Sequence, residues 1–245
     1  MDKIKLERLA DILRNSERVV FFGGAGVSTE SGLRDYRSED GIYNSISKYG
    51  YPPEEILSHE FFFDKTAAFY EFYRDFFMGK PQPNDAHIAL ARLEEIGKLT
   101  AVITQNIDNL HQLAGSKTVL ELHGTTQKYT CPRCGKKYTR EYLEKTQGIP
   151  HCEKCNTPIK PDVVLYGEML DDNTVSAAIG AIADADTLII GGTSLAVYPA
   201  AGFIRYFKGK NLIVINKGAT SMDDRADLLF RDSIGQVLGQ AVALL

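Results

Sequence analysis

The chain has 245 residues, of which 44% are hydrophobic and 24% charged, and its formal net charge is −4. This length suits one large domain, or a large domain with a small one. The mildly acidic balance argues against a nucleic acid or a membrane surface as the partner. No apolar run is long enough to span a bilayer, and the first residues predict a charged amphipathic helix instead of a signal peptide. We therefore expect a cytoplasmic protein.

The hydrophobic pattern alternates between two kinds of element. Leu6, Leu9, Ala10 and Leu13 recur at helical spacing and predict an amphipathic helix over residues 4–15. Short apolar runs occur at 19–22, 101–104, 119–122, 187–190 and 212–215. Helical patterns near 85–95 and 175–183 separate several of these runs. Buried strands that alternate with helices predict a parallel sheet covered on both faces, an α/β fold.

Two stretches interrupt this alternation. Residues 34–84 are rich in tyrosine and phenylalanine and predict an inserted helical module, in which most of the aromatic side chains form core. Residues 124–162 are polar and contain every cysteine of the chain. Both stretches are therefore expected to lie outside the parallel sheet.

The four cysteines form two pairs, Cys131-x-x-Cys134 and Cys152-x-x-Cys155, with seventeen residues between the pairs. This spacing is typical of a zinc ribbon in which four thiolates hold one tetrahedral ion. Two disulfides or a redox pair are the alternatives. The doubled motif argues against a redox pair, and the absence of a secretion signal argues against disulfides. Four thiolates leave no open coordination position, so we expect a structural zinc.

A glycine-rich turn follows the first predicted strand. Gly24-Ala25-Gly26-Val27-Ser28 stands where a dinucleotide-binding fold places its phosphate-binding turn. As a general fingerprint the turn is incomplete, because Thr29 occupies the position of the third glycine and no acidic residue ends a second strand about twenty residues later. Taken alone, this segment leaves an ordinary tight turn as an open alternative.

The longer string from residue 24 to residue 38, GAGVSTESGLRDYRS, resembles the sirtuin signature GAGxSxxSGIPDFR. Further segments match that family in the required order: Thr104 to Asp108, Leu122-His123-Gly124, the cysteine pairs, Pro161 to Glu168, Gly192 to Leu195, and Val214-Ile215-Asn216. The matches cover nearly the whole chain, and little flanks them. The chain is therefore similar to sirtuins of bacterial type.

This resemblance implies a Rossmann-like doubly wound domain, formed by 1–33, 85–123 and 163–245, and a smaller part. The smaller part would combine the cofactor loop and helical insert, 34–84, with the zinc-ribbon module, 124–162. The implied activity is NAD-dependent removal of acyl groups, acetyl above all, from protein lysines, which releases nicotinamide and O-acyl-ADP-ribose. The implied partners are acyl-lysine proteins or peptides, without nucleic acid or membrane, and the chain is expected to be a monomer.

The resemblance also assigns roles to residues. His123 would be the base that accepts a ribose proton, a role that suits an imidazole. Asn106 and Asp108 would assist the departure of nicotinamide. Judged alone, a single histidine is more often structural, and Asn106 and Asp108 could simply cap a helix. The implied cofactor contacts are Gly24, Ala25, Gly26, Ser28, Thr29, Tyr36, Arg37, Gln105, Asn106, Ile107, Asp108, His123, Gly192, Thr193, Ser194, Asn216 and Ile234. The implied substrate contacts are Val164, Tyr166, Gly167, Glu168 and Leu195.

The sequence departs from the family pattern at several points. Arg34 replaces a proline and Tyr36 a phenylalanine in the cofactor loop, and Asn109 stands where a glycine is common. Tyr73 aligns with the tyrosine of the Tyr-x-x-Arg pair of desuccinylating sirtuins, but Phe76 stands in place of the arginine. Neutral acyl groups are therefore expected, and Arg34 is the residue that could still favour an acidic one.

Two other functions remain open at this stage. The same chemistry could transfer ADP-ribose to a protein, or a degenerate member could bind NAD or ADP-ribose as a sensor without catalysis. His87 and His111 carry no assigned role: His87 is expected to pack at a helix start, and His111 to be satisfied in the interior.

Overall fold

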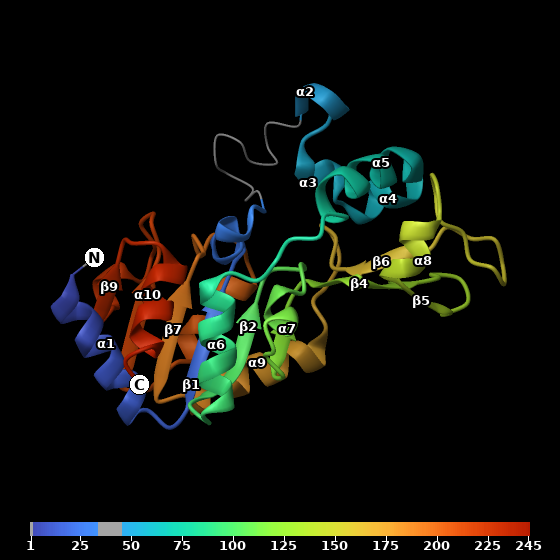
Figure 1. Ribbon diagram of the computed structural model, residues 1–245. Coiled ribbons are helices and arrows are strands. Elements are labelled where there is room, and N and C mark those ends of the chain that lie inside the picture. Colours follow the sequence, from blue (N-terminus) through green and yellow to red (C-terminus); the bar gives the residue numbers. More distant parts are fainter. Residues whose placement is uncertain (1, 34–45) are drawn as a thin grey trace.

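The computed structural model describes residues 2–33 and 46–245. Its larger part is a parallel sheet with the strand order β3-β2-β1-β7-β8-β9, which confirms the predicted fold class (Figure 1). The strands are β1 (Val19–Gly23), β2 (Leu99–Thr104), β3 (Val119–Glu121), β7 (Thr187–Gly191), β8 (Asn211–Ile215) and β9 (Leu228–Phe230). Every predicted apolar run forms one of these strands, because a strand buried on both faces needs apolar side chains at consecutive positions. The short β9 lies outside those runs.

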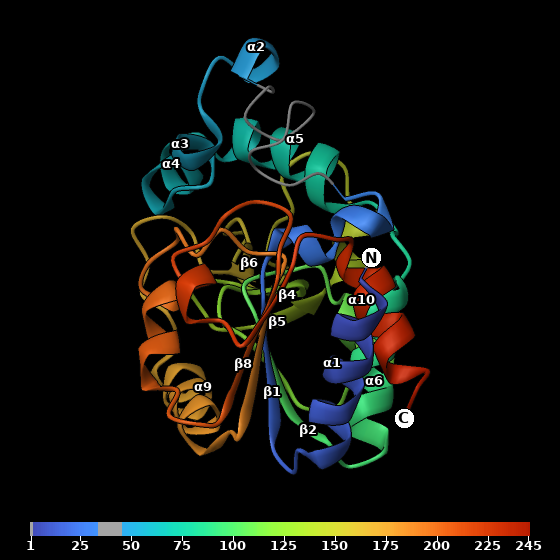
Figure 2. The same ribbon diagram turned by 90° about the vertical axis from the view of Figure 1, so that its left-hand side faces the viewer.

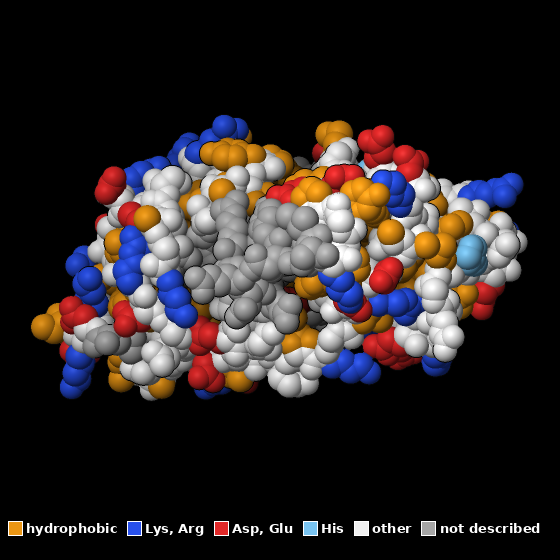
Figure 3. All heavy atoms as spheres, turned by 90° about the horizontal axis from the view of Figure 1, so that it is seen from above, with side chains coloured by type: hydrophobic (Ala, Val, Ile, Leu, Met, Phe, Trp, Pro, Cys, Tyr) orange, Lys and Arg blue, Asp and Glu red, His pale blue; other side chains and the backbone are white. Residues whose placement is uncertain are grey.

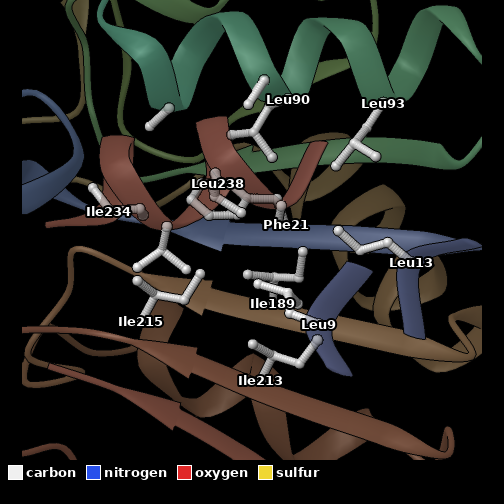
Figure 4. Close-up of a cluster of buried hydrophobic side chains, with 14 of the residues drawn as sticks. Leu9, Leu13, Phe21, Leu90, Leu93, Ile189, Ile213, Ile215, Ile234 and Leu238 are labelled. Carbon is white, nitrogen blue, oxygen red and sulfur yellow. The ribbon is translucent and has the colours of Figure 1, made fainter. Parts of the chain in front are cut away.

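Helices cover both faces of the sheet (Figure 2). One face carries α1 (Lys3–Asn15), α6 (Asp85–Glu95) and α10 (Ile234–Val242), and the other carries α9 (Asp172–Asp184) and the 3₁₀ segment η4 (Ala200–Tyr206). Leu9, Leu13 and Leu90 pack on Phe21 and Ile189 of the strands in one buried cluster (Figure 4). Burying a side chain of this size contributes roughly 1.5–3 kcal/mol, so this face supports the strand ends that carry the site.

The smaller part has its own core. An antiparallel sheet of order β5-β4-β6 is formed by β4 (Gly124–Thr130), β5 (Lys137–Thr139) and β6 (Lys160–Val163). Its helices are α2 (Ile46–Tyr49), α3 (Pro53–Ile56), α4 (His59–Asp64), α5 (Thr66–Phe77) and α8 (Arg140–Lys145). Most aromatic side chains of α4 and α5 are buried, as expected, whereas Phe63 is 48% exposed. Among the described residues no helix is long and apolar enough to cross a membrane.

One hydrophobic cluster joins the helical insert to the ribbon. Phe69, Tyr70 and Tyr73 of α5 pack with Tyr129 of β4 and with Cys152 in a single buried set. The Tyr70 hydroxyl donates a hydrogen bond of 2.5 Å to the carbonyl of Ile159. Two segments far apart in the sequence therefore share one core.

Candidate active site

The order of the strands places a crevice between β1 and β7. From β1 the chain proceeds outward through β2 and β3 on one side, and β7, β8 and β9 extend on the other. Gly23 and Gly191 lie opposite each other at the carboxyl ends of the two central strands. In open α/β sheets ligands bind at such a switch point, which is where the glycine-rich turn begins.

Two glycines make the approach of these strand ends possible. The amide of Gly26 donates a hydrogen bond of 2.8 Å to the carbonyl of Gly192. A Cβ atom at Gly26 would lie 2.8 Å from the Cα of Gly192, and one at Gly192 would lie 2.3 Å from the amide nitrogen of Val27. Gly192 also has a φ of +59°, which side chains disfavour. Larger residues at either position would force the turn away from β7.

A large cleft opens at this edge, between the parallel sheet and the smaller part, with a volume of about 1300 Å³. This exceeds the roughly 300–1,000 Å³ of pockets for single drug-sized ligands, so two substrates can fit. Every described cofactor candidate lines the cleft: Gly24, Ala25, Gly26, Ser28, Thr29, Gln105, Asn106, Ile107, Asp108, His123, Gly192, Thr193, Ser194, Asn216 and Ile234. Tyr36, Arg37 and Arg34 lie outside the described residues.

His123 occupies the two-residue turn between β3 and β4. Its Nδ1 lies 2.9 Å from the carbonyl oxygen of Gln105, an acceptor, so Nδ1 must carry the proton. The neutral ring therefore presents an unprotonated Nε2. Burial lowers the pKa of His123 below its usual 6.5, and the bond to Gln105 offsets part of that effect. The side chain is thus held as a base at neutral pH.

Asn106, Ser28 and Asp108 form a directed chain of hydrogen bonds. The Asn106 Nδ2 donates to the Ser28 hydroxyl over 3.0 Å, and that hydroxyl donates to Asp108 Oδ2 over 2.7 Å. Asp108 Oδ1 also accepts from the amide of Leu110 over 2.9 Å. Asp108 therefore bonds the first amide of α7 (Leu110–Leu113), whose N-cap residue is Asn109, while its second oxygen fixes the glycine-rich turn. The two roles coexist.

Asn109 illustrates how the chain accommodates a departure from the family pattern. Its φ is +67°, in the left-handed region, which explains why a glycine is common there. Asparagine tolerates this conformation better than other residues with a side chain. The substitution leaves the turn before α7 intact.

Four of the five substrate candidates, Val164, Tyr166, Gly167 and Glu168, line the cleft on one side. The amide of Val164 donates to the carbonyl of His123 over 2.9 Å. Tyr166 pairs with the insert, because its amide donates to Leu57 and its carbonyl accepts from His59, each over 2.9 Å. The fifth candidate, Leu195, does not line the cleft: its side chain is buried in the cluster beneath it.

Glu168 fixes the end of that segment. One carboxylate oxygen accepts from Lys160 and from the amide of Leu165, each over 2.9 Å. The other lies 2.9 Å from Nδ1 of His59. These hydrogen bonds, opposed by burial, hold the pKa of Glu168 below its usual value. The ionised carboxylate therefore braces the segment from inside the cleft.

The structure adds cleft residues to which no motif pointed. Phe77 and Arg140 line it from the smaller part, and Lys217 and Asp232 line it beside Asn216. No local signal could have identified Phe77 and Arg140, since α5 and α8 reach the cleft only through the folding of the smaller part, whereas Lys217 directly follows the motif that ends at Asn216. The face in Figure 3 carries basic and acidic side chains intermingled.

The four cysteines converge as the spacing predicted. Their Sγ atoms all lie within 4.8 Å of one another, with 3.4 Å between Cys131 and Cys155 and 3.5 Å between Cys134 and Cys152. A disulfide requires about 2.05 Å, whereas four thiolates at 2.3 Å from a tetrahedral ion lie about 3.8 Å apart. The cluster fits a structural zinc and does not line the cleft.

Two buried histidines lie behind the site. His87 on α6 and His111 on α7 have ring centroids 4.7 Å apart. The expectation that His111 is satisfied was wrong, because neither of its ring nitrogens has a hydrogen-bond partner among the described residues. Burial lowers the pKa of His87 to about 4 and that of His111 to about 3. Both rings are neutral in the folded protein at neutral pH.

This pair should make the protein less stable in mild acid. The unfolded chain takes up protons near pH 6.5 and the folded chain does not, so the free energy of unfolding falls as pH drops below 6.5. With a folded pKa of about 3, His111 alone should cost about 2 kcal/mol between pH 7.5 and 5.0. Urea unfolding of wild type and His111→Leu at both pH values measures this. The exposed control His151→Ala should keep the wild-type dependence of stability on pH. The same dependence in His111→Leu would contradict the prediction.

The comparisons with known proteins agree with the geometry. The model of the Sir2 family matches residues 24–199. A Clostridium acetobutylicum protein named NAD-dependent protein deacetylase is 56% identical over 236 residues, 96% of each chain. A protein of that name from Staphylococcus epidermidis is 45% identical over 243 residues, 99% of this chain and 98% of its own.

Solved structures give the same result. A Sir2 complex with a p53 peptide and NAD⁺ has a TM-score of 0.85 at 38% identity, and a Sir2 complex with deacetylated p53 peptide and 3′-O-acetyl-ADP-ribose has a TM-score of 0.88 at 38% identity. Each alignment covers 98% of both chains. The chain belongs to the Sir2 family.

Proposed function

We propose that this protein is an NAD-dependent protein-lysine deacylase that acts in the cytoplasm on acetyl-lysine segments of proteins. The proposal rests on the orientation of His123. Its ring is held with Nε2 unprotonated, in the same cleft as the glycine-rich turn and the Asn106–Ser28–Asp108 chain of hydrogen bonds. Deacylation of this kind requires a base, a site for the dinucleotide and a cleft wall that can bind the substrate peptide. The names of the relatives support the same reaction.

The turn between β1 and η1 (Ala25–Val27) fits the pyrophosphate of NAD. Its glycines let backbone amides approach a phosphate without an intervening side chain, at the carboxyl edge of the sheet. Thr193 and Asn216 extend the site toward the adenosine half across β7 and β8, and Gln105 Nε2 donates to Thr193 Oγ1 over 3.1 Å. When bound, NAD supplies an electrophilic ribose carbon. The chain orients it.

Asp108 and the backbone of Ile107 would hold the nicotinamide carboxamide of bound NAD, and Asn106 would order the adjoining ribose. Nε2 of His123 would accept the proton of a ribose hydroxyl, and the Gln105 carbonyl keeps the ring in the tautomer that can accept it. The substrate peptide adds a strand between Gly167-Glu168 and the segment from Gly192 to Val197. Because backbone hydrogen bonds supply most of that affinity, we expect loose sequence preference.

The direct experiment incubates the protein with an acetyl-lysine peptide, with and without NAD. Loss of acetyl that depends on NAD, with an equal amount of nicotinamide released, supports deacylation. Mass added to the peptide or protein would instead indicate ADP-ribosyl transfer. Binding of NAD without either change would indicate a sensor.

The acyl group is expected to be neutral. Tyr73 and Phe76 line the cleft, whereas Arg74 does not: it donates to the carbonyls of Leu143 and Gly148, each over 3.1 Å, in the smaller part. Among the described residues, the cleft is also lined by Arg140, Lys48 and Lys217. The Arg140 guanidinium is engaged by the carbonyls of Phe77 and Gly79 and by Glu144, and Lys48 pairs with Asp75. We expect the acyl end to meet the aromatic side chains of Tyr73 and Phe76.

Turnover of acetyl and succinyl peptides should differ accordingly. We expect kcat/KM for the acetyl peptide to exceed that for the succinyl peptide by at least tenfold, because Arg140, the arginine that lines the described part of the cleft, is engaged elsewhere and cannot compensate the desolvated carboxylate. Phe76→Arg should narrow this ratio, and Phe76→Leu is the control of similar polarity to wild type. Faster removal of succinyl by the wild type would contradict the prediction.

A further inference from the structure

Asn84 contacts the glycine-rich turn without lining the cleft, and it caps α6. Its Oδ1 accepts from the amide of Ala86 over 3.0 Å, as an N-cap side chain does. Its backbone amide donates over 3.2 Å to Nδ1 of His87. The usual capping box has glutamate or glutamine at the position of His87. Here a neutral imidazole performs that task, which the low pKa of His87 permits.

The amide nitrogen of the same side chain reaches the cofactor loop. Asn84 Nδ2 donates to the carbonyl of Val27 over 2.8 Å and to the hydroxyl of Ser31 over 3.0 Å. Val27 ends η1, and Ser31 ends the following turn η2 (Thr29–Ser31). One planar group therefore holds the ends of both turns that carry Ser28 and Thr29.

The segment is held from other directions by different contacts. Asn106 and Asp108 hold Ser28 from the cleft side. Glu30 accepts from the amide of Gly235 at the start of α10 over 3.2 Å. Asn84 supplies the side-chain hydrogen bonds that join the start of α6 to the pair of turns, and its three polar bonds leave it one orientation. Its removal would leave the back of the loop unsupported.

We infer that Asn84 is a positioning residue for NAD, which sets the two turns of the pyrophosphate-binding loop against α6 while touching neither substrate. The inference rests on the proposed function for its ligand, but its structural content does not depend on catalysis. The two polar atoms of the Asn84 side chain have different roles: Oδ1 stabilises the helix, and Nδ2 orders the loop.

Two substitutions keep the first property and remove the second. Asn84→Asp and Asn84→Ser both retain a good N-cap acceptor. Aspartate cannot donate to Val27, and serine is too short to reach both loop partners while capping. The aspartate brings a negative charge and the serine does not, so an effect common to both reports the lost donation. Asp2→Asn, at the N-cap of α1 and remote from the loop, is the matched control.

Two measurements follow. Calorimetric titration of NAD without peptide should give a Kd raised about tenfold in both variants, the loss expected when hydrogen bonds of this kind are removed. Hydrogen exchange without NAD should be faster at the amides of Ser28, Ser31 and Gly32, which bond within the turns. The KM for the acetyl peptide should stay close to wild type, as should every value for Asp2→Asn.

Wild-type Kd and wild-type exchange in both variants would overturn the inference, and so would an effect confined to Asn84→Asp, which would indicate charge alone. Failure of the proposed function appears elsewhere, as a wild-type protein that leaves an acetyl peptide intact. The exchange measurement still tests Asn84 in that case, because it requires neither NAD nor turnover.

Discussion

Replacing His123 by alanine is expected to lower kcat/KM for an acetyl-lysine peptide by about 10²–10⁴-fold, the usual contribution of a general base. The ring has an acceptor nitrogen in the cleft and a second nitrogen fixed on the carbonyl of Gln105. Alanine removes the acceptor and leaves the glycine-rich turn untouched. NAD binding by calorimetry should therefore change far less than turnover.

His151→Ala is the matched control for this variant. Nδ1 of His151 also lies 2.9 Å from a backbone carbonyl, that of Ile149, but the side chain is exposed in the ribbon and does not line the cleft. Its activity should equal that of wild type. Deacylation by His123→Ala at the wild-type rate would remove the central assignment of the mechanism.

The pH dependence of kcat/KM tests the same residue independently. A base acts when unprotonated, and burial lowers the pKa of His123. The acidic limb of the kcat/KM profile should consequently fall below pH 6.5, and activity should persist into mild acid further than an exposed histidine would allow. A limb above pH 6.5 would mean either that the pKa of His123 is not lowered in the free enzyme or that another group sets the profile, and each result contradicts the prediction.

Much of the fold was predictable because its signals are local. Each central strand is a continuous apolar run, and each site motif follows a strand end, where parallel sheets bind ligands. The helix α10 was not predicted, since Gly235 and Gly239 lower helix propensity. The structure explains the first of them: a Cβ atom at Gly235 would lie 2.6 Å from Oε2 of Glu30, whose carboxylate accepts from the Gly235 amide. A Cβ atom at Gly239 would make only an ordinary contact of 3.5 Å with the Cβ of Asp85 on α6.

The remaining omissions depend on contacts between distant segments. Asn84 precedes an ordinary helix in the sequence, and nothing nearby indicates that its amide reaches Val27 and Ser31. A histidine in place of glutamate or glutamine also hides the capping box. The placement of Arg140 in the cleft depends on how the ribbon packs against α5. Such features follow from tertiary structure alone.

Removing the zinc should abolish deacylation while leaving NAD binding largely intact. Cys131 and Cys152 belong to the buried cluster that also contains Tyr73, and Tyr73 lines the cleft. The Tyr138 hydroxyl donates to the Sγ of Cys152 over 3.1 Å, so the ligands are tied to that core. Without the ion, four buried or half-buried thiols lose their common partner and the ribbon unfolds locally. The peptide wall of the cleft then loses its support.

The experiment compares chelated wild type and Cys152→Ser with Lys154→Ser, an exposed residue between two ligands of the same knuckle. Metal analysis should give one zinc per chain in wild type and in Lys154→Ser, and none after chelation. Limited proteolysis should cut within 124–162 only in the zinc-free samples. Calorimetry should still detect NAD there, because the glycine-rich turn belongs to the parallel sheet, whose cluster shares no residue with the ribbon. Full turnover by the zinc-free protein would contradict this prediction. It would mean that α5 and the substrate wall of the cleft keep their positions when the ribbon is unfolded.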